Sequence, residues 1–365
     1  MTTALAELTT MRIGGAPRRL VTADTEAELV EAVSGADAAG EPLLVVGGGS
    51  NLLVSDAGFA GTVVLVRTRG VQVPHHSSCG GVGVTVAAGE PWDELVAQAC
   101  EQGWSGIEAL SGIPGGTGAT PVQNVGAYGQ EVAQTLAQVR VWDRTERRVR
   151  TLFAADLDFS YRHSVLKGSM AAAGPGSVTP RYVVLTVTFS LRPTELSQPI
   201  GYAALADGLG VPLGERVPLG EARAAVLEQR RRRGMVLDPA DHDTWSCGSF
   251  FTNPILTAGQ REELQRRAAA LPGAPGSVAP EFPAVDGRVK TSAAWLIERA
   301  GFDKGYATTQ GRPAGLSTKH TLALTNRGSA RAQDVLAVAR EVRDGVRETF
   351  GVSLVNEPVL VGLEL

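Results

Sequence analysis

The sequence contains little cysteine, no excess of basic residues and no long apolar run. Its three cysteines, Cys79, Cys100 and Cys247, are far apart and odd in number, which argues against a disulfide framework or a cysteine-ligated metal. The 34 Lys and Arg residues are outnumbered by 38 Asp and Glu residues, and the net charge of -4 argues against a nucleic-acid partner. The histidines show no metal-ligand spacing, so we expect no metal site.

Export and membrane signals are missing from the pattern as well. Residues 1–8 have no basic region followed by an apolar core, and no later run approaches the roughly 20 apolar residues of a spanning helix. We therefore expect a cytoplasmic protein with no membrane partner. The 365 residues, 43% of them hydrophobic, are enough for two or three domains, and this composition favours small-molecule chemistry.

Local patterns predict a mixture of helices and strands. Thr25 and Glu28 form a capping box ahead of an apolar helix face, and alternation over 183–191 predicts a strand buried on one side. Ser329 is the expected cap of a late helix whose apolar stripe includes Val335 and Val346. We expect further strands at 43–46, 52–54, 62–66, 82–87 and 139–142, and further helices at 91–100, 221–233, 260–271 and 292–300.

Two glycine-rich segments are candidate ligand loops. The first, Gly47-Gly48-Gly49-Ser50-Asn51, follows a strand and could offer amide donors to a phosphate, or it could be a simple turn. It does not fit the Rossmann fingerprint, since a strand pattern follows it. The second runs through 111–129 and includes Gln123 and Asn124; it could wrap a flat or phosphorylated ligand, or be a flexible loop.

Polar side chains outside these loops are further candidates. Ser249 lies between Gly248 and two phenylalanines, where its hydroxyl could donate a proton to a reacting carbon; the alternative is a turn that enters a strand. Arg162 follows Tyr161 and could bind a carboxylate, although exposed arginines are as common there. Glu357 could be a solvated acid. Arg230–Arg233 could meet a diphosphate or a nucleic acid, although an acidic chain favours a solvated helix end.

Taken together, the motifs resemble the UDP-N-acetylenolpyruvoylglucosamine reductase (MurB) family, in the same order and over nearly the whole chain. The segments that carry the resemblance are 47–51, 113–115, 121–129, 161–162, 248–254 and Glu357. The resemblance implies an α+β protein, with an FAD-binding domain of the vanillyl-alcohol oxidase and p-cresol methylhydroxylase type built from two α/β subdomains, and a C-terminal α+β substrate-binding domain. The implied domains are 1–66 and 67–195 for the two subdomains, 196–220 for a crossing segment, and 221–365 for the substrate domain, whose last residues could return to the FAD domain.

The resemblance also implies a chemistry and a set of site residues. NADPH would reduce FAD, and the flavin would reduce an enolpyruvyl sugar nucleotide to UDP-N-acetylmuramate in a monomeric enzyme. Ser249 would be the proton donor, with Arg162 and Glu357 stabilising the enolate. The implied FAD-binding residues are Gly47, Gly48, Gly49, Ser50, Asn51, Pro114, Gly115, Gln123, Asn124, Gly126, Ala127 and Tyr128. The implied substrate-binding residues are Tyr161, Tyr202, Arg233, Asn253, Lys304 and His320, with Tyr202 typical of the subtype that closes a mobile tyrosine loop.

Two positions depart from the family pattern. Arg233 stands where a lysine is often found, which keeps the charge but changes its geometry. Cys247 stands where a smaller residue is common, and could be an apolar filler or an oxidation-sensitive thiol. The alternatives to this function are another FAD-dependent oxidoreductase of the same fold and a catalytically silent nucleotide-binding protein.

Overall fold

The computed structural model describes residues 3–77, 81–172, 177–271 and 276–365, so Cys79 lies outside the described residues. The chain divides into two compact units, which are described separately. The first is built from Ala16–Gly49 and Phe59–Val236, and the second from Ala4–Gly15, Ser50–Gly58 and Leu237–Leu365.

The first unit begins with a small parallel sheet and one helix. Strands β1 (Pro17–Ala23), β4 (Phe59–Val66) and β2 (Leu43–Val46) lie in that order in the sheet. Helix α1 (Glu26–Ala38) begins after Thr25, whose side chain accepts a hydrogen bond from the Glu28 backbone NH, so the predicted capping box is confirmed. Leu29 and Val33 are fully buried on the face of this helix that packs on the sheet.

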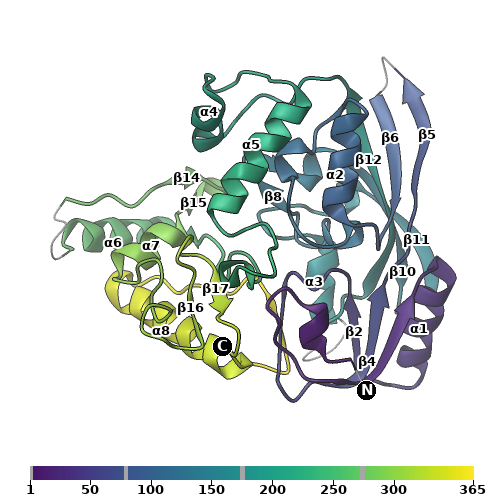
Figure 1. Ribbon diagram of the computed structural model, residues 1–365, viewed down its shortest axis with the longest axis horizontal. Coiled ribbons are helices and arrows are strands. Elements are labelled where there is room, and N and C mark those ends of the chain that lie inside the picture. The colour runs from purple at the N-terminus through teal and green to yellow at the C-terminus, as the bar shows by residue number, and fades with distance from the viewer. Residues whose placement is uncertain (1–2, 78–80, 173–176, 272–275) are drawn as a thin grey trace. The chain divides into compact units, whose positions relative to one another are not determined.

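A larger antiparallel sheet follows, with strands in the order β11 (Arg148–Phe153), β10 (Leu136–Asp143), β12 (Tyr182–Pro193), β6 (Gly81–Ala87) and β5 (Val71–Ser77) (Figure 1). The predicted alternation is confirmed in β12, where Val187 and Phe189 are fully buried. Helix α2 (Trp92–Glu101) packs on this sheet through Trp92, whose ring centroid lies 5.7 Å from that of Phe189. The small elements of this unit are β7 (Trp104–Ser105), β8 (Gly126–Ala127), β9 (Gln130–Glu131) and α3 (Val165–Ala172).

The first unit ends with α4 (Ala203–Leu209) and α5 (Leu219–Arg232). Leu205 of α4 and Val226 of α5 share a small apolar core with Ile200. Because this packing holds α5 in the first unit, the division falls after Val236. The predicted substrate domain begins earlier, at residue 221.

In the part of the second unit that the structure describes, three α-helices pack with short strands. The helices are α6 (Ala258–Ala269), α7 (Ala293–Arg299) and α8 (Ala332–Phe350). A small sheet has the strand order β13 (Ile255–Leu256), β15 (Val289–Lys290) and β14 (Phe282–Pro283). A separate pair is formed by β16 (Ala314–Leu316) and β17 (Leu324–Asn326). The predicted stripe of α8 is confirmed, since Val335, Val342 and Val346 are fully buried. Ser329 is not the cap of this helix. The N-cap is Arg331, whose backbone NH donates to Asp334 Oδ2 at 2.8 Å.

The chain end returns to the segment that follows the first glycine cluster. Strand β18 (Val359–Val361) pairs in parallel with β3 (Leu52–Val54), and both belong to the second unit. The backbone NH of Val359 also donates to the carbonyl of Asn51 at 3.0 Å. The last residues of the chain therefore lie beside residues 51–54.

Candidate functional site

The two glycine clusters meet in the first unit, although 67 positions separate Gly48 from Gly115 in the sequence. A Cβ atom on Gly48 would lie 2.5 Å from the Cα of Gly115, so any side chain there would collide with backbone. Gly49 and Gly115 have φ values of 63° and 130°, which glycine adopts most readily. The clusters thus form a cradle of bare backbone, defined here as residues 47–49 and 115–116.

Arg67 lies at this cradle and was not among the residues predicted from the sequence. Its Nη1 donates to the carbonyl oxygens of Gly47 and Val66, each at 3.0 Å. Burial is the main reason that the pKa of the guanidinium is lowered, but an arginine remains a cation in proteins. Since Arg67 follows the end of β4 with no recognisable motif, only the fold reveals that it places positive charge beside the cradle.

The segment 121–129 runs through a turn into β8, the first strand of a tight β-hairpin with β9. Gly126 and Ala127 pair with Glu131 and Gln130. Asn124 is buried, with 1% of its surface exposed, and its side chain makes hydrogen bonds to Glu131 Oε2, to the Ser160 carbonyl and from the Ala133 NH. These contacts shape the loop, and the expected contact of Asn124 with a ligand stays a prediction.

Arg162 is attached directly to this hairpin. Its Nη2 donates to the Gly126 carbonyl at 3.1 Å, and its Cζ lies 5.3 Å from the centroid of the Tyr161 ring. Both side chains are half-buried, and Arg162 has a φ of 55°. The structure therefore places the Tyr161–Arg162 pair next to the predicted cofactor loop, within the first unit.

A second group of charged and aromatic residues surrounds Tyr128 in the same unit. The ring centroids of Tyr128 and Tyr202 are 5.4 Å apart with an edge-to-face geometry, and Arg233 Cζ lies 5.9 Å from the Tyr128 centroid. Arg230 is half-buried, and burial lowers the pKa of its guanidinium. The interpretation of 230–233 as a solvated helix end is thus wrong for Arg230, because helix α5 turns it inward.

Ser249 and Glu357 lie close together in the second unit. The carbonyl of Phe250, the residue after Ser249, accepts a hydrogen bond of 2.8 Å from the Glu357 backbone NH. Asn51 Nδ2 donates to the Glu357 carbonyl at 3.4 Å, so the end of the first glycine motif joins the same group. Ser249 is half-buried, whereas the rings of Phe250 and Phe251 beside it are almost fully buried.

The remaining predicted substrate residues also lie in the second unit. Asn253 Oδ1 accepts a hydrogen bond of 2.9 Å from the backbone NH of Ala293, at the start of α7. His320 is half-buried, and its backbone NH donates to Ser317 Oγ; Lys304 is exposed. A backbone hydrogen bond links the segment that carries Asn253 to the segment that carries His320, because the Phe250 NH donates to the Leu322 carbonyl at 2.7 Å.

The burial of Cys247 bears on which of its two predicted roles applies, an apolar filler or an oxidation-sensitive thiol. The side chain is 7% exposed, and its thiol donates to the Leu52 carbonyl at 3.1 Å. Burial raises the pKa of the thiol to about 12, so the thiolate that reacts with oxidants is scarce at neutral pH. These observations support the apolar filler and argue against an oxidation-sensitive thiol.

In the described part of the chain, no cluster of three or more His, Cys, Asp or Glu side chains is placed to hold a metal ion. A search of the same residues for a helix with the length and apolar character needed to cross a membrane also finds none.

Comparisons with known proteins agree with this division. A family model described as an FAD binding domain matches residues 17–152, and one described as the C-terminal domain of UDP-N-acetylenolpyruvoylglucosamine reductase matches 238–361. The solved structure of such a reductase (MurB) from Thermus caldophilus aligns with a TM-score of 0.61 and 25% identity, over 98% of this chain and 97% of that one. The fold and these matches define a flavoprotein oxidoreductase, which confirms the predicted fold class.

Sequence relatives identify the family. The chain is 53% identical to UDP-N-acetylenolpyruvoylglucosamine reductase of Thermobifida fusca, over 99% of this chain and 97% of the relative. It is 55% identical to the enzyme of that name from Saccharopolyspora erythraea, over 99% of this chain and 95% of the relative. The chain belongs to the UDP-N-acetylenolpyruvoylglucosamine reductase family.

The cradle fits the cofactor that this family membership implies. FAD carries a pyrophosphate, which is bound well by backbone NH groups that approach closely and by a nearby cation. The lack of a side chain at Gly48 lets the backbones of the two glycine clusters come together, since a Cβ atom there would lie 2.5 Å from the Gly115 Cα, and Arg67 supplies the cation. The residues present therefore suit FAD.

Proposed function

We propose that this enzyme uses NADPH and FAD to reduce the enolpyruvyl double bond of UDP-N-acetylglucosamine enolpyruvate, yielding UDP-N-acetylmuramate for peptidoglycan precursor synthesis. Family membership supports the overall reaction. The observation that supports the catalytic assignment is the hydrogen bond between the Phe250 carbonyl and the Glu357 NH, which keeps Ser249 and Glu357 together. FAD, when bound, supplies hydride to the terminal alkene carbon.

Ser249 is the proposed proton donor. Addition of hydride to the terminal carbon leaves negative charge on the neighbouring carbon, shared with the attached carboxylate. A serine hydroxyl is a weak acid, so its contribution depends on the basicity of that enolate and on correct placement. The buried rings of Phe250 and Phe251 fix the backbone on the C-terminal side of Ser249.

Arg162 and Glu357 are the proposed stabilisers of the enolate. A guanidinium or a protonated carboxyl can donate hydrogen bonds to a carboxylate as it gains charge, and such donors lower the barrier most when they are already oriented. Arg162 is oriented by its bond to Gly126, and the backbone of Glu357 is held by Phe250 and Asn51.

Further residues are proposed to hold the cofactor and the sugar nucleotide. The FAD pyrophosphate is assigned to the cradle, with Arg67 as an additional cation and residues 121–129 beside the flavin. The substrate diphosphate is assigned to Tyr202 and Arg233, whose neighbour Tyr128 links them in the structure. The sugar and its remaining polar groups are assigned to Tyr161, Asn253, Lys304 and His320.

The preference for NADPH, a monomeric state and a cytoplasmic location are part of the same proposal. All three rest on the family resemblance.

A product assay tests the proposed function. Purified enzyme with NADPH and the enolpyruvyl sugar nucleotide should yield a product heavier by two hydrogen atoms in mass spectrometry, in amounts equal to the NADPH oxidised. NADPH oxidation that depends on oxygen but leaves the sugar nucleotide unchanged would instead indicate another flavin-dependent oxidoreductase. A purified protein that carries no flavin and oxidises no NADPH would indicate a silent binding protein.

A further inference from the structure

Glu108 is a buried carboxylate that none of the roles above uses. It lies in the short 3-10 helix η2 (Glu108–Leu110), and only 2% of its surface is exposed. Its oxygens accept hydrogen bonds from the Gly106 NH at 2.6 Å, from Gln130 Nε2 at 2.9 Å and from the Gln198 NH at 2.5 Å. A buried charge is tolerated when several donors surround it, and here the donors come from three different segments.

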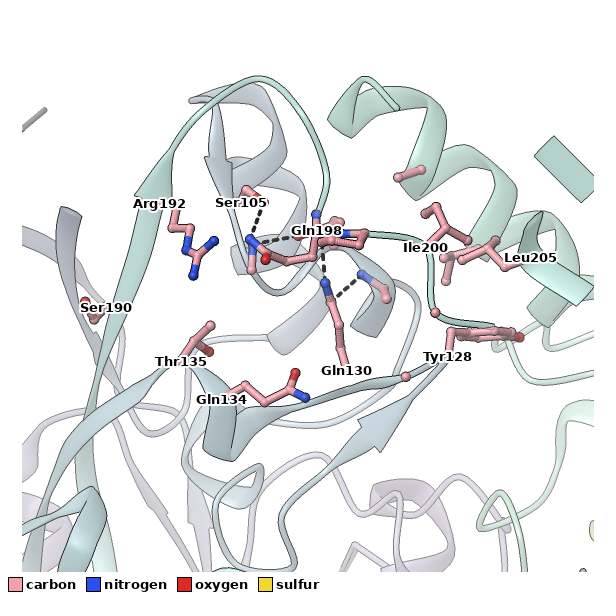
Figure 2. Close-up of a pocket in the computed structure, with 18 residues that line it drawn as sticks. Ser105, Tyr128, Gln130, Gln134, Thr135, Ser190, Arg192, Gln198, Ile200 and Leu205 are labelled. Carbon is pink, nitrogen blue, oxygen red and sulfur yellow. Dashed lines mark hydrogen bonds between the residues drawn. The ribbon is translucent and has the colours of Figure 1, made fainter. Parts of the chain in front are cut away.

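The partners of Glu108 are themselves held in place. Gln130 Oε1 accepts from the Ala109 NH at 2.8 Å, and Gln198 Nε2 donates to Ser105 Oγ at 3.0 Å, as the dashed lines of Figure 2 show for this group. Gln130 is two residues after Tyr128, and Gln198 is four residues before Tyr202. Glu108 therefore connects the chain segments that carry these two tyrosines.

Residues 197–217, named here the tyrosine segment, have a closed base. The Ser197 NH donates to the Val217 carbonyl and the Ile200 NH to the Glu215 carbonyl, each at 2.8 Å. Farther along the tyrosine segment, Gly201 packs against Gly129: a Cβ atom on Gly129 would lie 3.7 Å from the carbonyl carbon of Gly201. The Tyr128–Tyr202 contact is made by the neighbouring residues. The tyrosine segment therefore joins the β8–β9 hairpin at two places: at its base, where Glu108 bonds Gln130 and Gln198, and at Tyr202, which packs against Tyr128.

A cavity of about 310 Å³ lies along this junction (Figure 2). Its lining includes the polar residues Glu108, Gln130 and Gln198 and the apolar residues Ile200 and Leu205. Side chains that line a cavity lack packing partners on that side, so packing contributes less to their placement. The hydrogen bonds of Glu108 therefore contribute more than packing does to the position of residues 198–202.

We propose that Glu108 is a positioning residue: it holds Gln130 and Gln198 so that Tyr202, which packs against Tyr128, is placed to bind the sugar nucleotide. This inference rests on the substrate role proposed above for Tyr202. Removing the charge of Glu108 should release the tyrosine segment from the hairpin without altering the cradle, whose closest contacts lie between Gly48 and Gly115.

The kinetic test compares Glu108→Gln with Glu195→Gln, which alters an exposed carboxylate near the same segment. Glu108→Gln should raise KM for the sugar nucleotide by about tenfold or more while kcat changes by less than about threefold, as expected when uniform binding is lost. Glu195→Gln should match the parent enzyme, and Glu108→Asp, which retains the charge, should show a smaller increase. Equal losses in kcat and kcat/KM with unchanged KM would overturn the proposal.

A double-mutant cycle distinguishes positioning from a general loss of structure. If Glu108 acts through Tyr202, then Glu108→Gln should add less than about twofold to the KM of Tyr202→Ala. Multiplication of the two effects would contradict this route. Glu108→Asp should be carried through the same cycle, so that the proposal is still tested if Glu108→Gln fails to fold.

Hydrogen exchange tests the anchor independently of activity. Amides of residues 198–205 should exchange at least about fivefold faster in Glu108→Gln than in the parent, with strand β12 unchanged, because a local opening releases only the segments that it frees. Unchanged exchange at 198–205 would overturn the proposal. If the parent enzyme fails to reduce the sugar nucleotide, the proposed function fails, whereas this exchange result still decides whether Glu108 holds the segment.

Discussion

Replacement of Ser249 by alanine should remove the proton donor and little else. The change deletes one oxygen from a half-buried side chain and leaves both backbone bonds of the next residue, from the Phe250 NH to Leu322 and from the Glu357 NH to the Phe250 carbonyl. We therefore expect the free energy of unfolding to change by less than about 1 kcal/mol, as for substitutions that create no cavity. The variant should bind FAD normally.

The catalytic effect should be large and confined to one half-reaction. A well-placed general acid contributes about two to four decades in rate, and each decade corresponds to about 1.4 kcal/mol of activation free energy. Ser249→Ala should therefore lose roughly 3 to 6 kcal/mol of transition-state stabilisation in the oxidation of reduced flavin by the sugar nucleotide. Flavin reduction by NADPH needs no proton from Ser249 and should proceed at the parent rate.

Stopped-flow absorbance measures the two steps separately under anaerobic conditions. Cys247→Ala is the matched control, since it alters a buried side chain two residues away. It should leave both rates within about threefold of the parent, because isosteric or small changes to apolar fillers are tolerated. Oxidation of reduced Ser249→Ala by the sugar nucleotide at the parent rate would refute the assignment of Ser249.

Three further predictions concern FAD binding at the cradle, the reactivity of the Cys247 thiol and the loss of folding stability at low pH. Gly48→Ala should purify with little FAD, measured by flavin absorbance, since its Cβ would lie 2.5 Å from Gly115; full occupancy would contradict the cradle. Cys247 should resist alkylation in the native protein at pH 8 and react after unfolding, because burial raises its pKa to about 12; rapid native labelling would contradict this. Burial opposes the ionisation of Asp143, but hydrogen bonds from Arg181 and Arg150 outweigh it and lower the carboxyl pKa. The stabilisation is therefore complete above the unfolded pKa of about 3.9 and is lost as pH falls towards the folded value. Asp143→Asn should flatten the decline of urea stability between about pH 5 and 2.5, and an unchanged slope would contradict this assignment.

Periodicity and capping patterns predicted the regular elements well. The alternation in β12 and the apolar stripe of α8 are confirmed because burial of one face is a local, repeating requirement that the sequence must satisfy. The Thr25 capping box is confirmed for the same reason. Ser329 fails as a cap because a helix can begin at several nearby polar residues, and here Asp334 satisfies the NH of Arg331 instead.

The site depends on contacts between distant parts of the chain, which local patterns cannot reveal. The close approach of Gly48 to Gly115 and the bond from Arg67 to Gly47 follow from the packing of β2 and β4 with the second glycine segment. The side chain of Asn124 donates to the Ser160 carbonyl, 36 positions along the chain. The link between Phe250 and Glu357 likewise joins residues that are 107 positions apart in the sequence.

The most direct test of the central claim follows the colour of the flavin in the parent enzyme without oxygen. Addition of NADPH should bleach the flavin absorbance, and later addition of the enolpyruvyl sugar nucleotide should restore it within seconds. The control is the same sugar nucleotide without its enolpyruvyl group, which should leave the flavin bleached. Failure of the enolpyruvyl compound to restore the colour, or equal restoration by both compounds, would contradict the claim that this enzyme reduces the enolpyruvyl double bond.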